Sequence, residues 1–464
     1  FIFIMSTLSD VDIQLNNDEK VIVEITAQLH ADWKQYSINI QSDDAVRIFS
    51  NNIHSGAQEL YVSPEFLKEI MTDAGVEYNS SLTIIDLARK LINHINDLQK
   101  PQVIRTIHPV GQGAMYSERF LNKEGETNFL AVYDCGSDNL RKLEREISAS
   151  FTKTDDIDLL FISHLDKDHI NGIRKLKDAV NSIKTVILPL IPASQKCIYL
   201  LMEDEISRRI ILEPEKFFSD SNIVKVKSVS ESKGTPDSLI YPLDDVQTLE
   251  SGTIIRLNDH SDPDWCYIPY NYDESERLND FDKKLSDEDI EKSRLNDPDY
   301  IDQHKDRLKK IYKDVCDGSV NNSSLVVYSG GLCTEYSSKY IHNTIRNSRH
   351  SGEACLYLGD ADMNQTQINA KTMVEDLKCH LNTHMVNNHI SMVQLPHHGS
   401  VKNFHNGLLS YGLASKLYFA SFGQNNHHGH PSTLTAGLIA ARNEIFCAVT
   451  EMRDSAIIQV IKKV

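Results

Sequence analysis

Residues 164–169 read His-Leu-Asp-Lys-Asp-His and follow a mostly apolar stretch, 157–162, that has the composition of a short buried strand. Four side chains of this segment are potential metal ligands: His164, Asp166, Asp168 and His169. They can converge on one point only if the backbone turns tightly, and the end of a buried strand holds such a turn rigidly. Because imidazole and carboxylate ligands together suit zinc, manganese or iron(II), we expect a metal site here.

Three further groups of His and Asp residues each follow a short apolar segment that we predict to be a strand. They are Gly359-Asp360, the sequence His-His-Gly-Ser at 397–400, and the sequence Gly-Gln-Asn-Asn-His-His-Gly-His-Pro at 423–431. A carboxylate such as Asp360 can bridge two cations and hold them about 3.5–4 Å apart, as two-metal hydrolysis requires. Each group alone is weak evidence, but together with residues 164–169 they predict a common metal centre.

The motifs resemble those of the metallo-β-lactamase superfamily, and in particular its ComEC-like branch, named after the hydrolase domain of a bacterial competence DNA-uptake protein. That branch reads V-G-Q-G, D-C-G, S-H-x-D-x-D-H, N-x-S-L, G-D, H-H-G-S and N-x-x-G-H-P. Here these motifs lie at residues 110–113, 134–136, 163–169, 322–325, 359–360, 397–400 and 426–431. The resemblance covers about residues 103–464 apart from an inserted segment, and it says nothing about residues 1–100.

The resemblance implies two divalent metal ions, zinc or manganese, and a role for each ligand. His164 and Asp166 are expected to bind the first metal. Asp168 and His169 are expected to bind the second, and Asp360 is expected to bridge the two.

Histidines from the last two motifs are expected to complete the metal sites. We expect His397 to complete one site and His430 the other, with His398 as the alternative to His397. The better-known superfamily pattern is H-x-H-x-D-H, whereas this chain has Asp166 at the middle position. An extra carboxylate adds hard oxygen character, which favours manganese relative to zinc. Ala114 also departs from the branch, which often has Asp after V-G-Q-G, so any role of that acid is in doubt here.

The implied chemistry is hydrolysis by a hydroxide that bridges the two metals. Asp168 is expected to orient or deprotonate the attacking water, and His398 to contact a phosphate or protonate the leaving group. Ser400, Asn426 and His428 are candidate substrate contacts, although Ser400 and Asn426 could equally be turn residues.

A nuclease or phosphodiesterase is the function that the resemblance favours, with nucleic acid or a nucleotide as substrate. Other ester classes stay open, since sites of this kind also hydrolyse phosphorylcholine esters, lactones and thioesters. A metal-stabilised sensor or binding module that acts with a partner protein, for example in bacterial defence, is the alternative from a different functional class.

The predicted fold is an α/β protein, the metallo-β-lactamase αββα sandwich, at residues 101–464. Residues 1–100 are predicted to form a small α+β domain of unknown role, a possible site for a protein partner. A charged, largely helical insertion is expected at about 195–320, either a solvated segment or a lid or partner arm. The apolar segments 445–450 and 456–461 are predicted to form a terminal hairpin.

Composition narrows the functional classes. The net charge of −18 argues against binding nucleic acid through a general basic surface, although it allows a local positive channel. The eight cysteines form no C-x-x-C pair, which indicates reduced thiols and a cytoplasmic protein. No apolar run approaches the roughly 20 residues that cross a membrane, so we expect no membrane partner.

Overall fold

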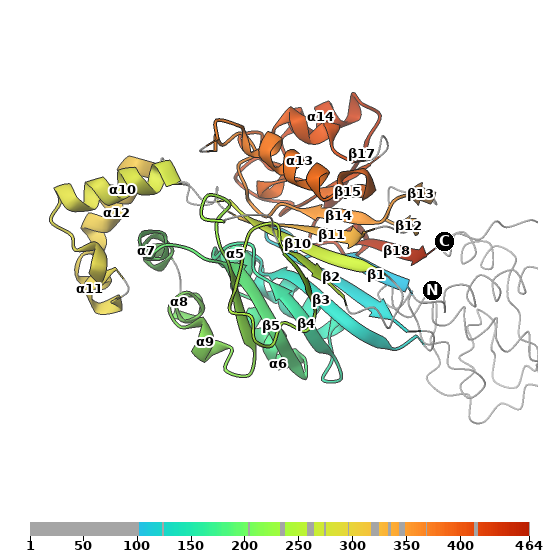
Figure 1. Cartoon of the computed structure of the whole chain (residues 1–464), viewed down its shortest axis with the longest axis horizontal. Coiled ribbons are helices and arrows are strands. Elements are labelled where there is room, and N and C mark those ends of the chain that lie inside the picture. The colour runs from blue at the N-terminus through green and yellow to red at the C-terminus, as the bar shows by residue number, and fades with distance from the viewer. Residues whose placement is uncertain are drawn as a thin grey trace, which may run out of the picture.

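The computed structural model describes residues 102–463 except for gaps at 123–124, 203–204, 233–236, 258–263, 273–274, 296, 317–323, 333–335, 343–348, 368 and 413–415. Within these residues two β-sheets pack face to face and helices cover their outer surfaces (Figure 1). This αββα arrangement confirms the predicted fold class. The predicted N-terminal domain at 1–100 and Asn322-Ser323 of the N-x-S-L motif lie outside the described residues.

Each sheet combines parallel and antiparallel strands. The first sheet contains, in spatial order, β13 (Arg349–Ser351), β12 (Tyr336–Ile341), β18 (Ile457–Lys463), β1 (Gln102–Ile107), β2 (Met115–Leu121), β3 (Thr127–Cys135), β4 (Asp156–Phe161), β5 (Ser182–Pro189), β6 (Asn222–Val226) and β8 (Thr248–Leu249). The second contains β17 (Ile445–Val449), β16 (Leu417–Ser421), β15 (Ile390–Gln394), β14 (Ala354–Tyr357), β11 (Leu325–Gly331), β10 (Trp265–Asn271), β9 (Ile254–Arg256) and β7 (Ser238–Ile240).

Parallel strands lie where the metal motifs begin. β3, β4, β5 and β6 are parallel in the first sheet, and β14, β15, β16 and β17 are parallel in the second. Such strands are buried on both faces and therefore read as apolar runs, as β4 and β15 do. Because parallel strands end at the same edge of a sheet, the turns that follow them gather there.

Capped helices connect these strands on the outer faces. α4 (Leu140–Ser150) begins after Asn139, whose side chain accepts a hydrogen bond from the Lys142 N–H, and α6 (Ile173–Ala179) follows the 164–169 segment. On the second sheet, α13 (Met373–Thr383) begins with a capping box and α14 (Thr433–Ala440) begins after Ser432, whose hydroxyl accepts from Leu434 N–H.

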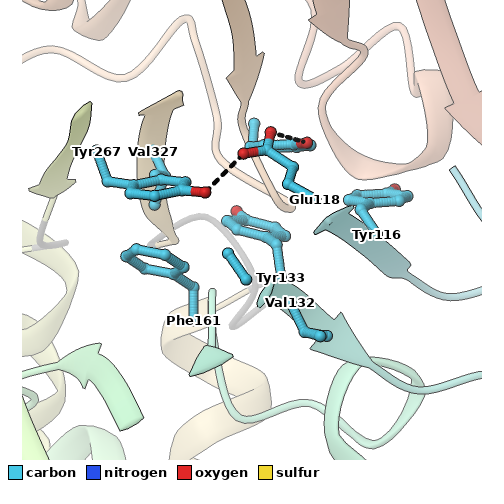
Figure 2. Close-up of a pocket in the computed structure, with 9 residues that line it drawn as sticks. Tyr116, Glu118, Val132, Tyr133, Phe161, Tyr267 and Val327 are labelled. Atoms are coloured by element: carbon cyan, nitrogen blue, oxygen red, sulfur yellow. Dashed lines mark hydrogen bonds between the residues drawn. The ribbon is translucent and has the colours of Figure 1, made fainter. Parts of the chain in front are cut away.

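The central hydrophobic layer lies between the two sheets. It includes Leu159 and Phe161 from β4, Val327 from β11 and Phe419 from β16, all at most 1% exposed. Burying each such side chain contributes about 1.5–3 kcal/mol, so this layer fixes how the two sheets face each other. It also encloses a cavity of about 10 Å³, enough for about one water molecule, beside the carboxylate of Glu118 (Figure 2).

The segment at about 195–320 contains strands as well as helices. β6 and β8 extend the first sheet, and β10 pairs with β11 in the second, so both sheets run through the predicted insertion. Its helical parts are α7 (Ala193–Met202), α8 (Glu205–Leu212) and α9 (Pro214–Phe217), and then α10 (Ser275–Asp287), α11 (Pro298–Gln303) and α12 (Lys305–Cys316). In Figure 1, α10, α11 and α12 project from the sandwich beside α7. Phe281, Leu285 and Leu308 are buried in this group, so it has an apolar core and is not a fully solvated segment.

The predicted terminal hairpin is wrong, because its two strands belong to different sheets. β17 is parallel to β16 at the edge of the second sheet, whereas β18 lies between β12 and β1 in the first. The short turn between them, which includes Arg453–Ser455, therefore crosses from one sheet to the other. Apolar segments of similar length show that both are strands, but do not show which strand each one pairs with.

Two further features of the described residues concern the cysteines and the helices. Among the described residues the following cysteines are free thiols: Cys135, Cys197, Cys266, Cys355, Cys379 and Cys447. None of the described helices has the length and apolar character needed to span a bilayer.

Candidate metal centre

Three of the four motifs contribute residues to one cluster at an edge of the sandwich. The 164–169 segment follows β4, Asp360 follows β14, and His397 and His398 follow β15. β4 belongs to the first sheet and the other two strands to the second, so each sheet provides part of the site. Residues more than two hundred positions apart in the chain are thereby brought within a few ångströms of Asp360.

Glycines allow two other motifs to pack beneath the 164–169 turn. A Cβ atom on Gly136 would lie 2.4 Å from the Asp168 carbonyl carbon, and one on Gly113, which has a φ of +136°, would lie 2.6 Å from the Asp168 oxygen. The Ala114 N–H donates to the same oxygen at 3.3 Å. The V-G-Q-G and D-C-G motifs therefore support the backbone from which Asp168 and His169 project.

Asp360 is the centre of the cluster, and each of its two oxygens faces two histidines. Oδ2 lies 3.8 Å from His164 Nε2 and 3.6 Å from His397 Nε2. Oδ1 lies 3.3 Å from His169 Nε2 and 3.8 Å from His398 Nε2. Two ligands bound to one tetrahedral zinc at bond lengths of about 2.1 Å are about 3.4 Å apart, so these separations match shared coordination.

Aspartates of the 164–169 segment lie beside each pair of histidines. Asp168 Oδ2 is 3.2 Å from His398 Nε2, and Asp166 Oδ2 is 4.0 Å from His164 Nε2. By these distances the candidate ligands fall into two sets, His164, Asp166 and His397 beside Oδ2 of Asp360, and Asp168, His169 and His398 beside Oδ1. Among the described residues, two groups have all their ligand atoms within 4.8 Å of one another: His164, His169 and Asp360, and Asp168, His169 and His398.

Several buried ligand atoms of these residues lack hydrogen-bond partners, which bears on whether the residues suit a cation. His164 Nε2, His169 Nε2, His398 Nε2 and Asp360 Oδ1 are all buried and have no hydrogen-bond partner among the described residues. A buried polar atom without a partner costs about 1–3 kcal/mol, so four in one cluster would be a large penalty. The ligand atoms of His164, His169 and Asp360 lie within 4.8 Å of one another, as do those of Asp168, His169 and His398, and cations there would satisfy the four atoms. The donor set therefore fits divalent metal.

In three of these histidines, Nδ1, the ring nitrogen that does not face Asp360, lies within hydrogen-bond distance of an acceptor oxygen. His169 Nδ1 is 2.8 Å from Asp134 Oδ2, and His398 Nδ1 is 2.8 Å from the carbonyl oxygen of Ser421. His397 Nδ1 is 3.1 Å from the Asn403 side-chain oxygen. Such contacts orient each ring so that Nε2 is directed inward, as they do in known metal sites.

A left-handed turn brings both adjacent histidines to Asp360. His397, His398 and Gly399 have φ values of 48°, 55° and 84°. Non-glycine residues adopt this conformation at a cost of about 1–2 kcal/mol each. We expected one histidine to bind metal and its neighbour to face the substrate, but the turn directs one ring to each oxygen of Asp360.

Opposite charges dominate the electrostatics of the cluster. Burial lowers the pKa of His164 to about 3, and the neighbouring His169 adds to this effect. Burial alone would raise the pKa of Asp360, but His397, His169 and His398 bring it well below its usual value. Burial alone would lower the pKa of His169, but Asp360, Asp168 and Asp134 raise it well above its usual value. Without a cation, protons on histidines balance the carboxylates.

A protein-family model matches this part of the chain. Residues 124–246, which include β3, β4 and the 164–169 segment, match the model described as the metallo-beta-lactamase superfamily. This match covers 123 of the 464 residues. No curated protein sequence matches the chain. Among solved structures, it is similar to a crystal structure of a long form RNase Z from yeast, with 11% sequence identity and a TM-score of 0.29. That similarity covers 70% of this chain and 38% of the yeast chain.

His430 lies beside the two candidate ligand sets. Its ring centre is 5.5 Å from that of His397 and 6.4 Å from that of His398. Among the described residues, the groups whose ligand atoms lie within 4.8 Å of one another include neither His430 nor His397. His398, the expected alternative to His397, does belong to such a group, together with Asp168 and His169. Burial lowers the pKa of His430 to about 4, with His397 and His398 adding to the effect.

The three predicted substrate contacts differ in their exposure and in their local hydrogen bonds. His428 is exposed and stacks on His430, with ring centres 5.8 Å apart. The Asn426 amide donates to the carbonyl oxygens of Gly423 and His430, both at 2.7 Å, and therefore closes its own loop. Ser400 is buried and its hydroxyl accepts from the Lys402 N–H. These hydrogen bonds favour the alternative interpretation, in which Asn426 and Ser400 are turn residues.

Sequence reasoning missed the residues that hold the ligands. Asp134 and Ser163 lie within the D-C-G and S-H motifs, so a signal was present, but no role had been assigned to them. Asn403 gave no signal, although its amide donates to the Asp360 carbonyl oxygen at 3.1 Å while its oxygen faces His397. Its importance depends on a tertiary contact that its neighbours in sequence do not reveal.

Proposed function

We propose that the protein is a metal-dependent hydrolase that cleaves phosphodiesters with two divalent cations. The observation that carries the proposal is the arrangement around Asp360, in which each carboxylate oxygen faces two buried imidazole nitrogens. A match of residues 124–246 to the metallo-beta-lactamase superfamily supports the same class of chemistry.

In this proposal the two ligand sets each hold one cation and Asp360 bridges them. A cation pair supplies charge stabilisation for substrate oxygens and a water that loses its proton near neutral pH. Asp166, Asp168 and Asp360 are three carboxylates in one centre, which favours manganese relative to an all-nitrogen site. Protein produced without added metal that holds only tightly bound zinc would contradict the preference for manganese.

The more exposed side chains of the centre are available to water and substrate. The Asp168 side chain is 20% exposed, whereas that of Asp360 is 2% exposed, so Asp168 is the carboxylate that an entering water can reach. His430 is half-buried beside His397 and is neutral at physiological pH. It can donate a hydrogen bond to the leaving oxygen, and the exposed His428 can contact a phosphate.

The substrate class rests on the resemblance to the ComEC-like motifs, which favours nucleic acid or a nucleotide. A net charge of −18 disfavours long contacts with a phosphate backbone, so we propose a small nucleotide or a strand that a partner delivers. Residues 1–100 remain our proposed site for such a partner, and free buried cysteines support a reducing cytoplasmic location.

A substrate panel tests the proposal directly. The full chain, loaded with Mn²⁺ or Zn²⁺, is incubated with bis-p-nitrophenyl phosphate, plasmid, single-stranded DNA, RNA, a lactone and a thioester. We expect hydrolysis of at least one phosphodiester that EDTA stops and that Asp168→Asn removes. Hydrolysis of only the lactone or thioester would overturn the substrate class. Binding of metal with no hydrolysis of any substrate would instead support the sensor or binding module.

A further inference from the structure

The metal-facing histidines differ in what fixes their tautomer. His169, His397 and His398 each place Nδ1 against an oxygen that acts as an acceptor, so Nδ1 carries the proton. His164 is different, because its Nδ1 lies near two hydroxyls, Ser163 Oγ at 2.8 Å and Ser324 Oγ at 3.3 Å. A hydroxyl can donate or accept, and the local contact alone leaves the His164 tautomer open.

Asp134 removes this ambiguity. Three donors converge on its two oxygens: the Ser163 N–H at 2.7 Å, the Ser163 hydroxyl at 2.6 Å and His169 Nδ1 at 2.8 Å. Three donors on one buried group are the environment of an ionised carboxylate, which only accepts. Ser163 has a single hydroxyl proton, and that proton is directed to Asp134. Ser163 Oγ can therefore only accept from the Nδ1–H of His164.

We propose that Asp134 is a positioning residue that sets the tautomer of both histidines in the 164–169 segment, His169 directly and His164 through Ser163. This inference rests on the proposed metal centre. With the proton held on Nδ1, the Nε2 lone pair of each ring faces Asp360. If His164 Nδ1 instead accepted a hydrogen bond, its proton would move to Nε2, where it would block a cation.

The chain from Asp134 to His164 is buried and geometrically fixed. Asp134 and Ser163 are both fully buried, so water does not compete for these hydrogen bonds. The Leu325 N–H donates to the Ser163 carbonyl oxygen at 2.7 Å and joins the turn to the second sheet. The hydroxyl of Ser324, the residue before Leu325, accepts from the Asp360 N–H at 3.0 Å. Ser324 therefore offers a matched control, because its hydroxyl approaches the same His164 nitrogen without a carboxylate behind it.

Metal titration of the full chain compares Ser163→Ala with Ser324→Ala. We expect Ser163→Ala to weaken Mn²⁺ or Zn²⁺ binding at one of two sites by about 10- to 100-fold, the usual effect of losing such an outer hydrogen bond. Ser324→Ala also removes the acceptor of the Asp360 N–H, but it leaves the chain from Asp134 through Ser163 to His164 intact, so it should weaken binding less than Ser163→Ala does and leave the His164 tautomer unchanged. Asp134→Asn should weaken both sites. Thermal unfolding without metal shows whether each variant folds, and if Asp134→Asn does not fold, the two serine variants still decide the question.

A second readout does not depend on metal. Nitrogen-15 NMR of the histidine-labelled chain distinguishes a ring protonated at Nδ1 from one protonated at Nε2. Wild type should show His164 protonated at Nδ1, and Ser163→Ala should move the proton to Nε2. Equal metal affinities for wild type and Ser163→Ala, or an unchanged His164 tautomer, would overturn the inference. A wild-type chain that binds no metal but shows the predicted tautomer would overturn the proposed function and leave the inference standing.

Discussion

Two of the clusters of buried charge among the described residues differ in whether their polar atoms are satisfied. In the core between the sheets, Arg105 is paired with Glu118 at 2.7 Å. Glu118 also accepts from the hydroxyls of Tyr267, Tyr357 and Ser329, the first of which is visible in Figure 2. The remaining Arg105 donors reach Glu353, Gln459 and Ser329. No atom of this pair is among the buried unpartnered atoms of the described residues.

The cluster around Asp360 is equally buried but incomplete. Four of its atoms lack hydrogen-bond partners among the described residues, and all of them face inward. Burial of charge therefore does not by itself distinguish a structural cluster from a functional one. The gathering of four unsatisfied atoms in one cluster does, because elsewhere among the described residues such atoms occur singly, as at Tyr270 and Thr435. Changing the two carboxylates separately should then affect different properties of the protein.

The largest expected effect is on activity, from Asp360→Asn. This change keeps the shape of the side chain and removes the bridging charge between the two ligand sets. Hydrolysis of the phosphodiester found by the substrate panel should fall by at least about 1000-fold, and metal binding should be lost with it. The unfolding temperature measured without metal should fall modestly, because the protonated histidines lose their counter-charge but can release their protons. A variant with near wild-type turnover would show that Asp360 is not the bridge.

The next effect is on stability, from Glu118→Gln. The amide leaves the Arg105 guanidinium buried without its counter-charge, which should cost about 3–5 kcal/mol in the free energy of unfolding. Denaturant unfolding measures this loss. Turnover per folded molecule should not change, since Glu118 does not belong to either ligand set. If Glu118→Gln removed metal binding from correctly folded protein, the division between structural and functional clusters would be wrong.

A change of pH is expected to have a smaller effect, on metal affinity. Burial alone would lower the pKa of His398, but Asp360 and Asp168 raise it, as carboxylates also raise that of His169. Because a cation must displace these protons, metal affinity should increase with pH by about tenfold per unit for each proton released, until the raised pKa is passed. Without metal, the stabilisation from protonated His169 should fall as pH rises through its pKa. Titrations at several pH values measure the slope, and a flat profile would contradict the assignment of His169 and His398 as ligands.

How much of the site the sequence could predict depends on how local each feature is. The 164–169 segment is a local signal, since its spacing and the strand before it are both visible in the sequence, and β4 confirms that strand. Asp360 and residues 397–400 could be predicted for the same reason. The directions of His397 and His398 could not be predicted, because they depend on the left-handed turn at 397–399.

The same limit applies to the fold. Apolar segments predicted most strands correctly, including β14, β15 and β16. They could not assign β17 and β18 to different sheets, because pairing depends on the packing of the whole chain. β10 was missed inside the predicted insertion, although Trp265, Tyr267 and Ile268 are almost completely buried, because charged helical sequence follows it closely.

Metal stoichiometry tests the central claim most directly. The full-length wild-type chain and Asp360→Asn are stripped with chelator, equilibrated with Mn²⁺ or Zn²⁺, freed of excess metal and measured by elemental analysis. The two ligand sets predict two cations per wild-type chain and fewer than one per Asp360→Asn chain. Wild-type protein that retains no metal, or an Asp360→Asn chain that retains as much as wild type, would contradict the claim that the buried histidines and Asp360 form a two-cation centre.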